Sequence, residues 1–429
     1  MERKLKRLII SAAIAMGLSV PAMATDLNLA RFFGDCQNAG TDTAKSVGEA
    51  CIIQSIINAA GAKIDGVKIT TLPTNWGNYY DQIKASYAAG TPPDIHVLHG
   101  SHLAEFTSVN ALADLTDDLA AAGIDAKDWE PKARDAVTYN GRIYGVPMDF
   151  HAELFHVNMD LMAKAGLVKD GKPILPTSPE EMLDQARKFK AATGKDYFAA
   201  ELGSGMMGVR IALGWIWQQG GNVFDGNKAT VNTPEAKKAL NLLVSLIHEK
   251  LVRGDLNYAD AEQAFLKGDV GILVNGTWPV DSYTAQAAKS DSAIKNYFVA
   301  DFPKIFASGA TWADNHMWAI PATVKAKTPD KYAVALKVLA FINDHDRDWA
   351  RTGHMSVRTS ILQSKAYAAL PHRNEYVATA SNAHGIPSVV KNGAIQDVLQ
   401  REFTATWLTG KSVDAALSDA NAEVQELLN

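Results

Sequence analysis

The stretch WGNYYDQIKASYAAGTPPDIHVLHGSH, residues 76–102, decides the fold class of this 429-residue chain. Tyr80, Ile83 and Tyr87 recur at helical spacing between polar residues, which predicts a helix with one apolar face. A glycine and two prolines then end the helix, because proline donates no backbone hydrogen bond and forces its predecessor into an extended conformation. The apolar run at residues 95–98 is typical of a buried strand.

Further strands are expected at residues 27–33 and 67–72, on the N-terminal side of this stretch. Alternating strands and helices predict an α/β fold with mostly parallel sheets. His99, Ser101 and His102 follow the 95–98 strand, and open α/β sheets bind ligands at the carboxyl ends of their strands. The sequence therefore predicts a polar binding site at this edge.

The length suggests two or three domains, and 47% hydrophobic residues suffice for ordinary cores. The first 24 residues have a basic head, an apolar run at residues 8–20 and a small-x-small site, which predicts a signal peptide cleaved after Ala24. A membrane anchor would need roughly 20 apolar residues. Without the leader the formal charge is about −8, and there are no basic runs, which argues against nucleic acid as a partner.

Cys36 and Cys51 are the only cysteines, and both lie in the part expected to be exported. A pair in an oxidising compartment predicts a structural disulfide. The alternative is a redox pair, which would more often have Cys-x-x-Cys spacing.

Several ordered motifs carry a family resemblance: WxxYY and AGTPPDI in the opening stretch, YNGRIYGVP at 139–147, FLKGDVGI at 265–272 and NGTW at 275–278. Together they resemble the extracellular solute-binding proteins of bacterial ABC importers, in the sugar-binding group that includes maltose-binding protein. The resemblance covers most of the chain after the leader.

The resemblance implies the two-lobed periplasmic-binding-protein fold of type II, in which each lobe is a mostly parallel sheet flanked by helices and hinge crossings join the lobes. We expect the first lobe at residues 25–148 plus 308–350 and the second at 149–307 plus 351–429. The first crossing is expected around residues 147–151. The second is expected at residues 302–304.

The resemblance also implies ligand contacts at turns and strand ends. The matching positions are Asp35, Ser101 and His102 with neighbouring His99, His151 with neighbouring Asp149, and the loop with Gly203 and Ser204. Maltose-binding protein has a carboxylate where this chain has His151, and this departure puts a maltodextrin ligand in doubt.

Aromatic residues near strand ends are the second group of candidates, because sugar C–H faces stack on aromatic rings. Trp76 begins the opening stretch, Asn275 and Trp278 follow a predicted strand, and Trp312 with Asp314, Asn315 and His316 follows the second crossing. For Trp278 and Trp312 the alternative is an ordinary place in the core. Arg358 either contacts the ligand or forms a surface ion pair.

Two patterns in the sequence suggest other chemistry. His96, His99 and His102 lack zinc-site spacing, and His96 falls inside a predicted strand, so we expect no metal. Residues 203–208 match G-x-G-x-x-G, with Asp225 about 20 residues later, but that dinucleotide fingerprint normally follows the first strand. We expect no cofactor.

These observations predict a monomeric periplasmic protein, not an enzyme, that binds a carbohydrate between its lobes and delivers it to the transmembrane subunits of an ABC permease. One alternative is a non-sugar solute such as a polyamine or phosphate ester. Another is a secreted glycoside-cleaving enzyme, whose paired carboxylates would be spatial rather than sequential neighbours.

Overall fold

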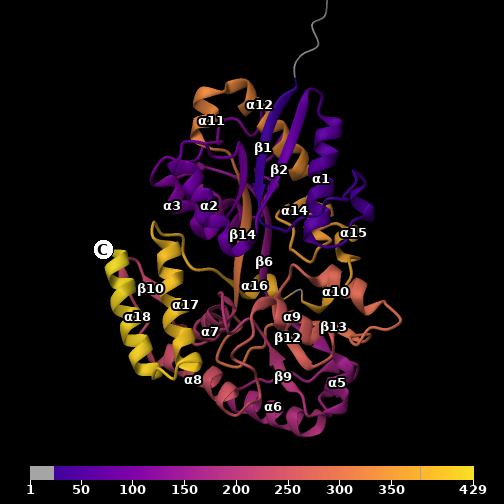
Figure 1. Cartoon of the computed structure of the whole chain (residues 1–429), viewed down its shortest axis with the longest axis vertical. Coiled ribbons are helices and arrows are strands. Elements are labelled where there is room, and N and C mark those ends of the chain that lie inside the picture. The colour runs from indigo at the N-terminus through magenta and orange to yellow at the C-terminus, as the bar shows by residue number, and fades with distance from the viewer. Residues whose placement is uncertain (1–23, 377) are drawn as a thin grey trace, which may run out of the picture.

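The two largest hydrophobic cores divide the computed structural model, which describes residues 24–376 and 378–429, into two lobes (Figure 1). The first lobe is built around residues such as Leu29, Val97 and Trp318, and the second around residues such as Phe198 and Ile272. The two-lobed α/β fold is therefore confirmed. Apart from Ala24, the predicted signal peptide lies outside the described residues.

A nine-stranded mixed sheet runs through both lobes, with the order β2-β1-β3-β14-β6-β12-β9, β13 beside β6 and β15 beside β14. Its strands are β1 (Thr25–Arg31), β2 (Val67–Pro73), β3 (Ile95–His99), β6 (Val146–Asn158), β9 (Asp196–Ala199), β12 (Val270–Gly276), β13 (Tyr297–Asp301), β14 (Thr311–Ala319) and β15 (Ala383–His384). Three hairpins pair β4 (Thr138–Tyr139) with β5 (Arg142–Ile143), β7 (Val168–Lys169) with β8 (Lys172–Pro173), and β10 (Phe224–Asp225) with β11 (Lys228–Ala229).

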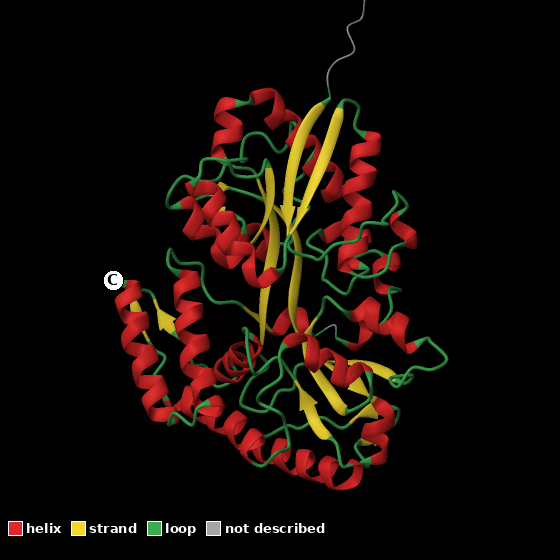
Figure 2. Cartoon of the chain, viewed as in Figure 1, coloured by secondary structure: helices red, strands yellow, loops and turns green. Residues whose placement is uncertain are grey.

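Helices cover the sheet in both lobes (Figure 2). Around the first lobe lie α1 (Glu49–Lys63), α2 (Trp76–Ala88), α3 (Leu103–Thr107), α4 (Pro131–Ala136), α11 (Ala322–Lys327), α12 (Pro329–Asp344), α13 (Asp346–Ala350), α14 (Thr359–Leu362) and α15 (Lys365–Ala368), with the short 3₁₀ turns η1 (Thr43–Lys45) and η2 (Gly100–His102). Around the second lie α5 (Met159–Lys164), α6 (Pro179–Thr193), α7 (Met207–Trp217), α8 (Pro234–His248), α9 (Tyr258–Leu266), α10 (Val280–Ala287), α16 (Thr379–Asn382), α17 (Asn392–Leu408) and α18 (Val413–Leu428), with η3 (Arg373–Glu375).

The opening stretch folds as α2 followed by β3, as its pattern predicts. The side chain of Asn75 caps α2 by accepting from the backbone N–H of Gly77. Tyr79 and Ile83 are buried, and Tyr80 and Tyr87 are partly buried against the same core. All five residues of β3 are buried, so this unit anchors the first lobe.

Two long strands join the lobes, and both run between the upper and lower halves of Figure 1. Residues 146–152 of β6 pair with β14 in the first lobe, whereas residues 153–158 pair with β12 and β13 in the second. The chain returns along β14, because Phe302 packs in the second core and Met317 in the first. The expected crossing at residues 302–304 was therefore placed too early.

The parallel pairing that helix and strand alternation predicts holds for β1 with β2 and β3, and for β12 with β9. The joining strands pair antiparallel with each other and with β3, β12 and β13, whereas β14 pairs parallel with β15. Cys36 and Cys51 form the predicted disulfide, which ties the β1–α1 loop to α1. In the described part of the chain, no helix combines the length and apolar character needed to span a membrane.

Candidate ligand-binding cleft

One face of the joining strands gathers most of the predicted polar and aromatic candidates. Strand side chains alternate between faces, so neighbours two apart point the same way. Register pairs His316 with Asp149, and Asp314 with His151. This face therefore carries Asp149, His151 and Glu153 on β6, and Trp312, Asp314 and His316 on β14.

Arg210 and three tryptophans, which we call the aromatic clamp, bring the two lobes together above this face. The Arg210 guanidinium carbon lies 3.8 Å from the ring centroid of Trp312 and 5.9 Å from the centroids of Trp278 and Trp76. Trp76 comes from α2 of the first lobe and is 39% exposed, whereas the other three belong to the second lobe. The clamp is thus an aromatic, cationic surface shared by both lobes.

Local structure fixes the position of Trp278. Its indole N–H donates to the hydroxyl of Tyr258 at 2.8 Å. A Cβ atom at Gly276 would lie 1.8 Å from the Trp278 ring, so only glycine lets the ring fold back over the end of β12. Asn275 is turned inward, where its side-chain amide donates to the hydroxyls of Tyr258 and Tyr283.

Two carboxyl groups lie beside Arg210. Glu153 is 1% exposed, its Oε1 lies 3.5 Å from the Arg210 guanidinium, and its Oε2 has no partner among the described residues. Burial raises the pKa of Glu153 to about 7, although Arg210 opposes the rise. Burial also raises the pKa of Glu201 to about 7. Near neutral pH each carboxyl group is therefore present both in its protonated form, which can donate a hydrogen bond, and in its ionised form, which only accepts.

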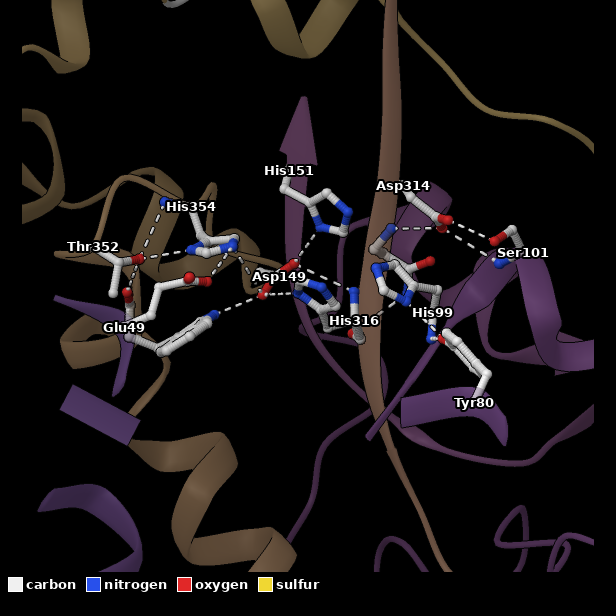
Figure 3. Close-up of polar contacts among 12 residues, drawn as sticks. Glu49, Tyr80, His99, Ser101, Asp149, His151, Asp314, His316, Thr352 and His354 are labelled. Atoms are coloured by element: carbon white, nitrogen blue, oxygen red, sulfur yellow. Dashed lines mark hydrogen bonds and ion pairs between the residues drawn. The ribbon is translucent and has the colours of Figure 1, made fainter. Parts of the chain in front are cut away.

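Below the clamp lies a layer of imidazoles, which we call the histidine floor: His99, His151 and His316. The rings of His151 and His316 stack with centroids 4.1 Å apart, and His99 meets His316 edge-on at 4.6 Å. Buried Asp149 accepts from Nδ1 of His151 at 3.1 Å and Nδ1 of His316 at 2.8 Å (Figure 3). Burial alone would raise the pKa of Asp149, but these neighbours hold it well below its usual value.

Trp349 adds a further donor to Asp149, because its indole N–H lies 2.6 Å from the carboxylate. At the first-lobe rim, the Ser101 hydroxyl donates to Asp314 at 2.6 Å, and the ring of His102 stacks on Tyr80 with centroids 4.0 Å apart. The structure therefore brings together the clamp tryptophans, the floor and this rim.

Other sequence candidates lie apart from this group. Asp35 is exposed and accepts from the side chain of Gln37. Asn315 is buried and lines the opposite face of the joining strands, together with Phe150. Arg358 pairs with Asp128, at 2.8 Å between Nε and Oδ2. The ion pair that the sequence offered as the alternative role for this arginine is thus present.

The glycine loop at 203–208 has a packing role. A Cβ atom at Gly203 would lie 2.4 Å from the carbonyl oxygen of Asp255, and one at Gly208 would press against Trp407. Ser204 is exposed on this loop. Close packing therefore accounts for these two glycines of the apparent dinucleotide fingerprint.

Sequence reasoning missed Glu153, Glu201, Arg210 and His354. Glu153 could have been found, because it continues the alternation of Asp149 and His151 along β6. No local pattern marks Arg210, whose importance comes from tryptophans more than 60 residues away in the chain.

Fold and site together define a two-lobed protein with an aromatic and polar surface shared by both lobes. Residues 52–346 match the family described as bacterial extracellular solute-binding protein, and the chain belongs to that family. A binding protein of Brucella abortus is 22% identical in an alignment of 432 positions, and the alignment covers 97% of this chain and 98% of that protein.

Solved structures share the fold. Maltose-bound MalE3 of Thermotoga maritima aligns with a TM-score of 0.80 and 24% identity, covering 94% of this chain and 99% of that one. The GacH receptor of Streptomyces glaucescens, solved unliganded and with acarbose, aligns with a TM-score of 0.79 and 18% identity, covering 95% and 99%.

Proposed function

We propose that this protein captures a carbohydrate between its lobes and delivers it to the transmembrane subunits of an ABC permease. The observation that carries the proposal is the aromatic clamp, in which Trp76 of one lobe faces Arg210, Trp278 and Trp312 of the other. Aromatic faces suit the C–H faces of a sugar ring, and adjacent polar groups suit its hydroxyls.

The polar groups beside the clamp match a hydroxyl-rich ligand. Arg210 is a fixed donor, and Glu153 and Glu201 can each donate or accept near neutral pH. The histidine floor adds further ring nitrogens below them. The sugars named for the structural relatives, maltose and acarbose, have this mixture of apolar faces and hydroxyls.

Ligand capture would work by closure of the lobes, which we place at residues 25–148 plus 308–350 and 149–307 plus 351–429. Core membership supports the first boundary, since Met148 packs in the first core and Phe155 in the second, whereas Ala310 and Trp312 still pack in the second core and move the return to the first lobe into β14. A sugar that touches Trp76 and Trp278 together binds the closed form more tightly, and this difference in affinity favours closure.

The family description as extracellular supports export of the chain. We infer that the chain is exported to the periplasm, is cleaved after Ala24 and acts as a monomer. We also infer that it is not an enzyme, although the buried carboxyl groups make this worth testing.

Calorimetry of the purified protein against mono- and oligosaccharides tests the proposal, with a polyamine and a phosphate ester in the same panel. We expect heat from at least one sugar, and loss of that heat in Trp76→Ala. Arg358→Lys, far from the clamp, is the matched control and keeps the affinity. Binding of the polyamine or phosphate ester alone would overturn the sugar assignment, and turnover of a chromogenic glycoside that is lost in Glu153→Gln would indicate an enzyme.

A further inference from the structure

His354, in the loop after α13, has a tautomer that its neighbours fix. Its imidazole is fully buried, and Nδ1 lies 2.7 Å from the hydroxyl oxygen of Thr352 (Figure 3). That hydroxyl has a single proton, which it donates to the carbonyl oxygen of Trp349 at 2.7 Å. Thr352 therefore accepts from Nδ1–H of His354, and Nε2 of His354 carries a lone pair.

The lone pair of His354 faces oxygen atoms and has no donor. Nε2 lies 3.5 Å from Oε1 of Glu49 and 3.8 Å from Oδ2 of Asp149, and it makes no hydrogen bond to the described residues. A buried acceptor that faces two carboxyl groups is unfavourable without something positive between them. This unpartnered nitrogen points to a cation.

Three further side chains that can bind a metal ion lie close to Nε2 of His354. Asp149, His151, His316 and His354 each offer one ligand atom, these atoms all lie within 4.8 Å of one another, and all four residues are buried. The nitrogens lie 3.1, 2.8 and 3.8 Å from the Asp149 carboxylate. Ligands bound to zinc at about 2.0–2.1 Å in a tetrahedron lie about 3.3 Å apart, and the three nitrogen–oxygen distances lie on both sides of that value. A bound ion would take the place of the protons that now join Nδ1 of His151 and Nδ1 of His316 to Asp149.

We propose that Asp149, His151, His316 and His354 form a binding site for one divalent transition-metal ion such as Zn²⁺. Three imidazoles with one carboxylate suit zinc and its neighbours, whereas Ca²⁺ and Mg²⁺ prefer oxygen ligands. Two positive charges would also balance the buried carboxylate of Asp149.

Outer contacts of the kind seen around metal ligands are in place. The Trp349 indole N–H holds Asp149, and the Thr352 hydroxyl holds Nδ1 of His354. Such partners orient ligand side chains and fix the tautomer that binds the ion.

The site would connect three segments at the boundary of the lobes. Asp149 and His151 lie on β6, His316 lies on β14, and His354 lies in a loop that bridges to β6 through Met355 and Phe150. An ion held by all three would stiffen the base of the cleft. His354 itself does not contact the sugar, because it is fully buried.

The histidines that the sequence groups together do not share this site. His96 bonds to the Tyr87 hydroxyl, His102 to Glu105, and His99 to the Tyr80 hydroxyl. The strands bring His151, His316 and His354 together from positions far apart in the chain, so sequence spacing could not reveal the cluster.

Metal analysis and Co²⁺ spectroscopy test the proposal on full-length protein purified without a histidine tag. After treatment with a chelator, we expect one equivalent of Zn²⁺ to bind by calorimetry, and one equivalent of Co²⁺ to give the visible bands of a nitrogen-rich, low-symmetry site. His354→Gln should weaken Zn²⁺ affinity by about tenfold to a hundredfold. The matched control, His384→Gln, replaces an exposed histidine outside the cluster and keeps full affinity.

Two results would overturn the metal site: no stoichiometric binding of either ion, or equal Zn²⁺ affinity in His354→Gln. The first would mean that a proton shared by Glu49 and His354 occupies the gap. If circular dichroism shows that the His354→Gln variant does not fold, the unmodified protein tests the metal site instead. A site is then shown by a Co²⁺ spectrum that disappears when Zn²⁺ is added, and its absence overturns the proposal. None of these readouts requires sugar binding, so the outcome is independent of the proposed transport role.

Discussion

Trp278 is the side chain whose loss separates sugar binding from folding most clearly. Its ring is partly exposed, faces Arg210 and His151, and is held by Tyr258. We predict that Trp278→Ala weakens sugar affinity at least tenfold, which corresponds to about 1.4 kcal/mol. Titration followed by calorimetry measures the change.

Trp129→Phe is the matched control for that substitution. Trp129 is buried in the first core, where its indole N–H donates to Asn343. The control should lower the free energy of unfolding by about 1 kcal/mol and leave sugar affinity unchanged. Equal affinity in Trp278→Ala and the unmodified protein would remove Trp278 from the binding surface.

Asp346 makes stability depend on pH. It is buried, the Ser356 hydroxyl donates to its Oδ2, and its Oδ1 has no partner among the described residues. Burial raises the pKa of Asp346 from 3.8 to about 7. Between pH about 4 and pH about 7, Asp346 therefore keeps its proton in the folded protein and loses it in the unfolded chain. The contribution of Asp346 to the free energy of unfolding is complete below pH about 4 and is lost as the pH rises to about 7.

Asp346→Asn removes that titration. Between pH 5 and pH 8 we expect the variant to gain about 2–3 kcal/mol of unfolding free energy relative to the unmodified protein. Urea unfolding at the two pH values measures the difference. Asp225→Asn, at an exposed carboxylate, should show no such change, and a pH-independent difference for Asp346→Asn would contradict the assignment.

Some residues of the candidate site could be predicted from the sequence and others could not. Alternation along β6 places Asp149 and His151 on one face, and the same rule leads to Glu153. Arg210 cannot be reached in this way, because its neighbours come from α2, β14 and the end of β12. Asn275 has suitable chemistry, but Tyr258 and Tyr283 satisfy its amide, which no local pattern announces.

Among the connecting elements, the disulfide between the β1–α1 loop and α1 offers a quantitative test. It closes a loop of 15 residues, and the chain-entropy model gives such a loop about 3 kcal/mol of stability. Replacing Cys36 and Cys51 by serine should lower the unfolding free energy by about that amount. Reductant should cause a similar loss in the unmodified protein and none in the double variant, and an equally stable double variant would contradict the prediction.

Helices, strands and turns that depend on a short stretch of sequence could be predicted from that stretch. The apolar stripe and the proline pair define α2 and β3, and Asn140 with Gly141, a pair typical of hairpin turns, forms the turn between β4 and β5 with positive φ at both residues. The family resemblance placed the return between the lobes at residues 302–304, which is too early in the chain. Phe302 instead packs in the second core, and long-range packing of this kind leaves no local signature.

Movement of the lobes relative to each other is the property of the whole molecule that the proposed function requires. The lobes meet where the backbone N–H of Gly48, before α1, donates to Asp281 of α10 at 2.9 Å. A Cβ atom at Gly48 would lie 3.1 Å from the hydroxyl oxygen of Ser282, which suits a disulfide between cysteines at these two positions. Gly48 has φ 81° and ψ 151°, a region essentially confined to glycine, so a cysteine there adds a cost of about 1–3 kcal/mol, which is smaller than the strength of a disulfide bond.

Gly48→Cys combined with Ser282→Cys should therefore lock the lobes together. We predict that the oxidised double variant takes up sugar at least tenfold more slowly than its reduced form, because the ligand enters only when the lobes part. Stopped-flow tryptophan fluorescence measures the rate, and the unmodified protein in the same reductant controls for the loss of Cys36–Cys51. If the oxidised variant with a verified new disulfide exchanged sugar as fast as its reduced form, ligand entry would not need the lobes to separate, and the closure mechanism would have to be abandoned.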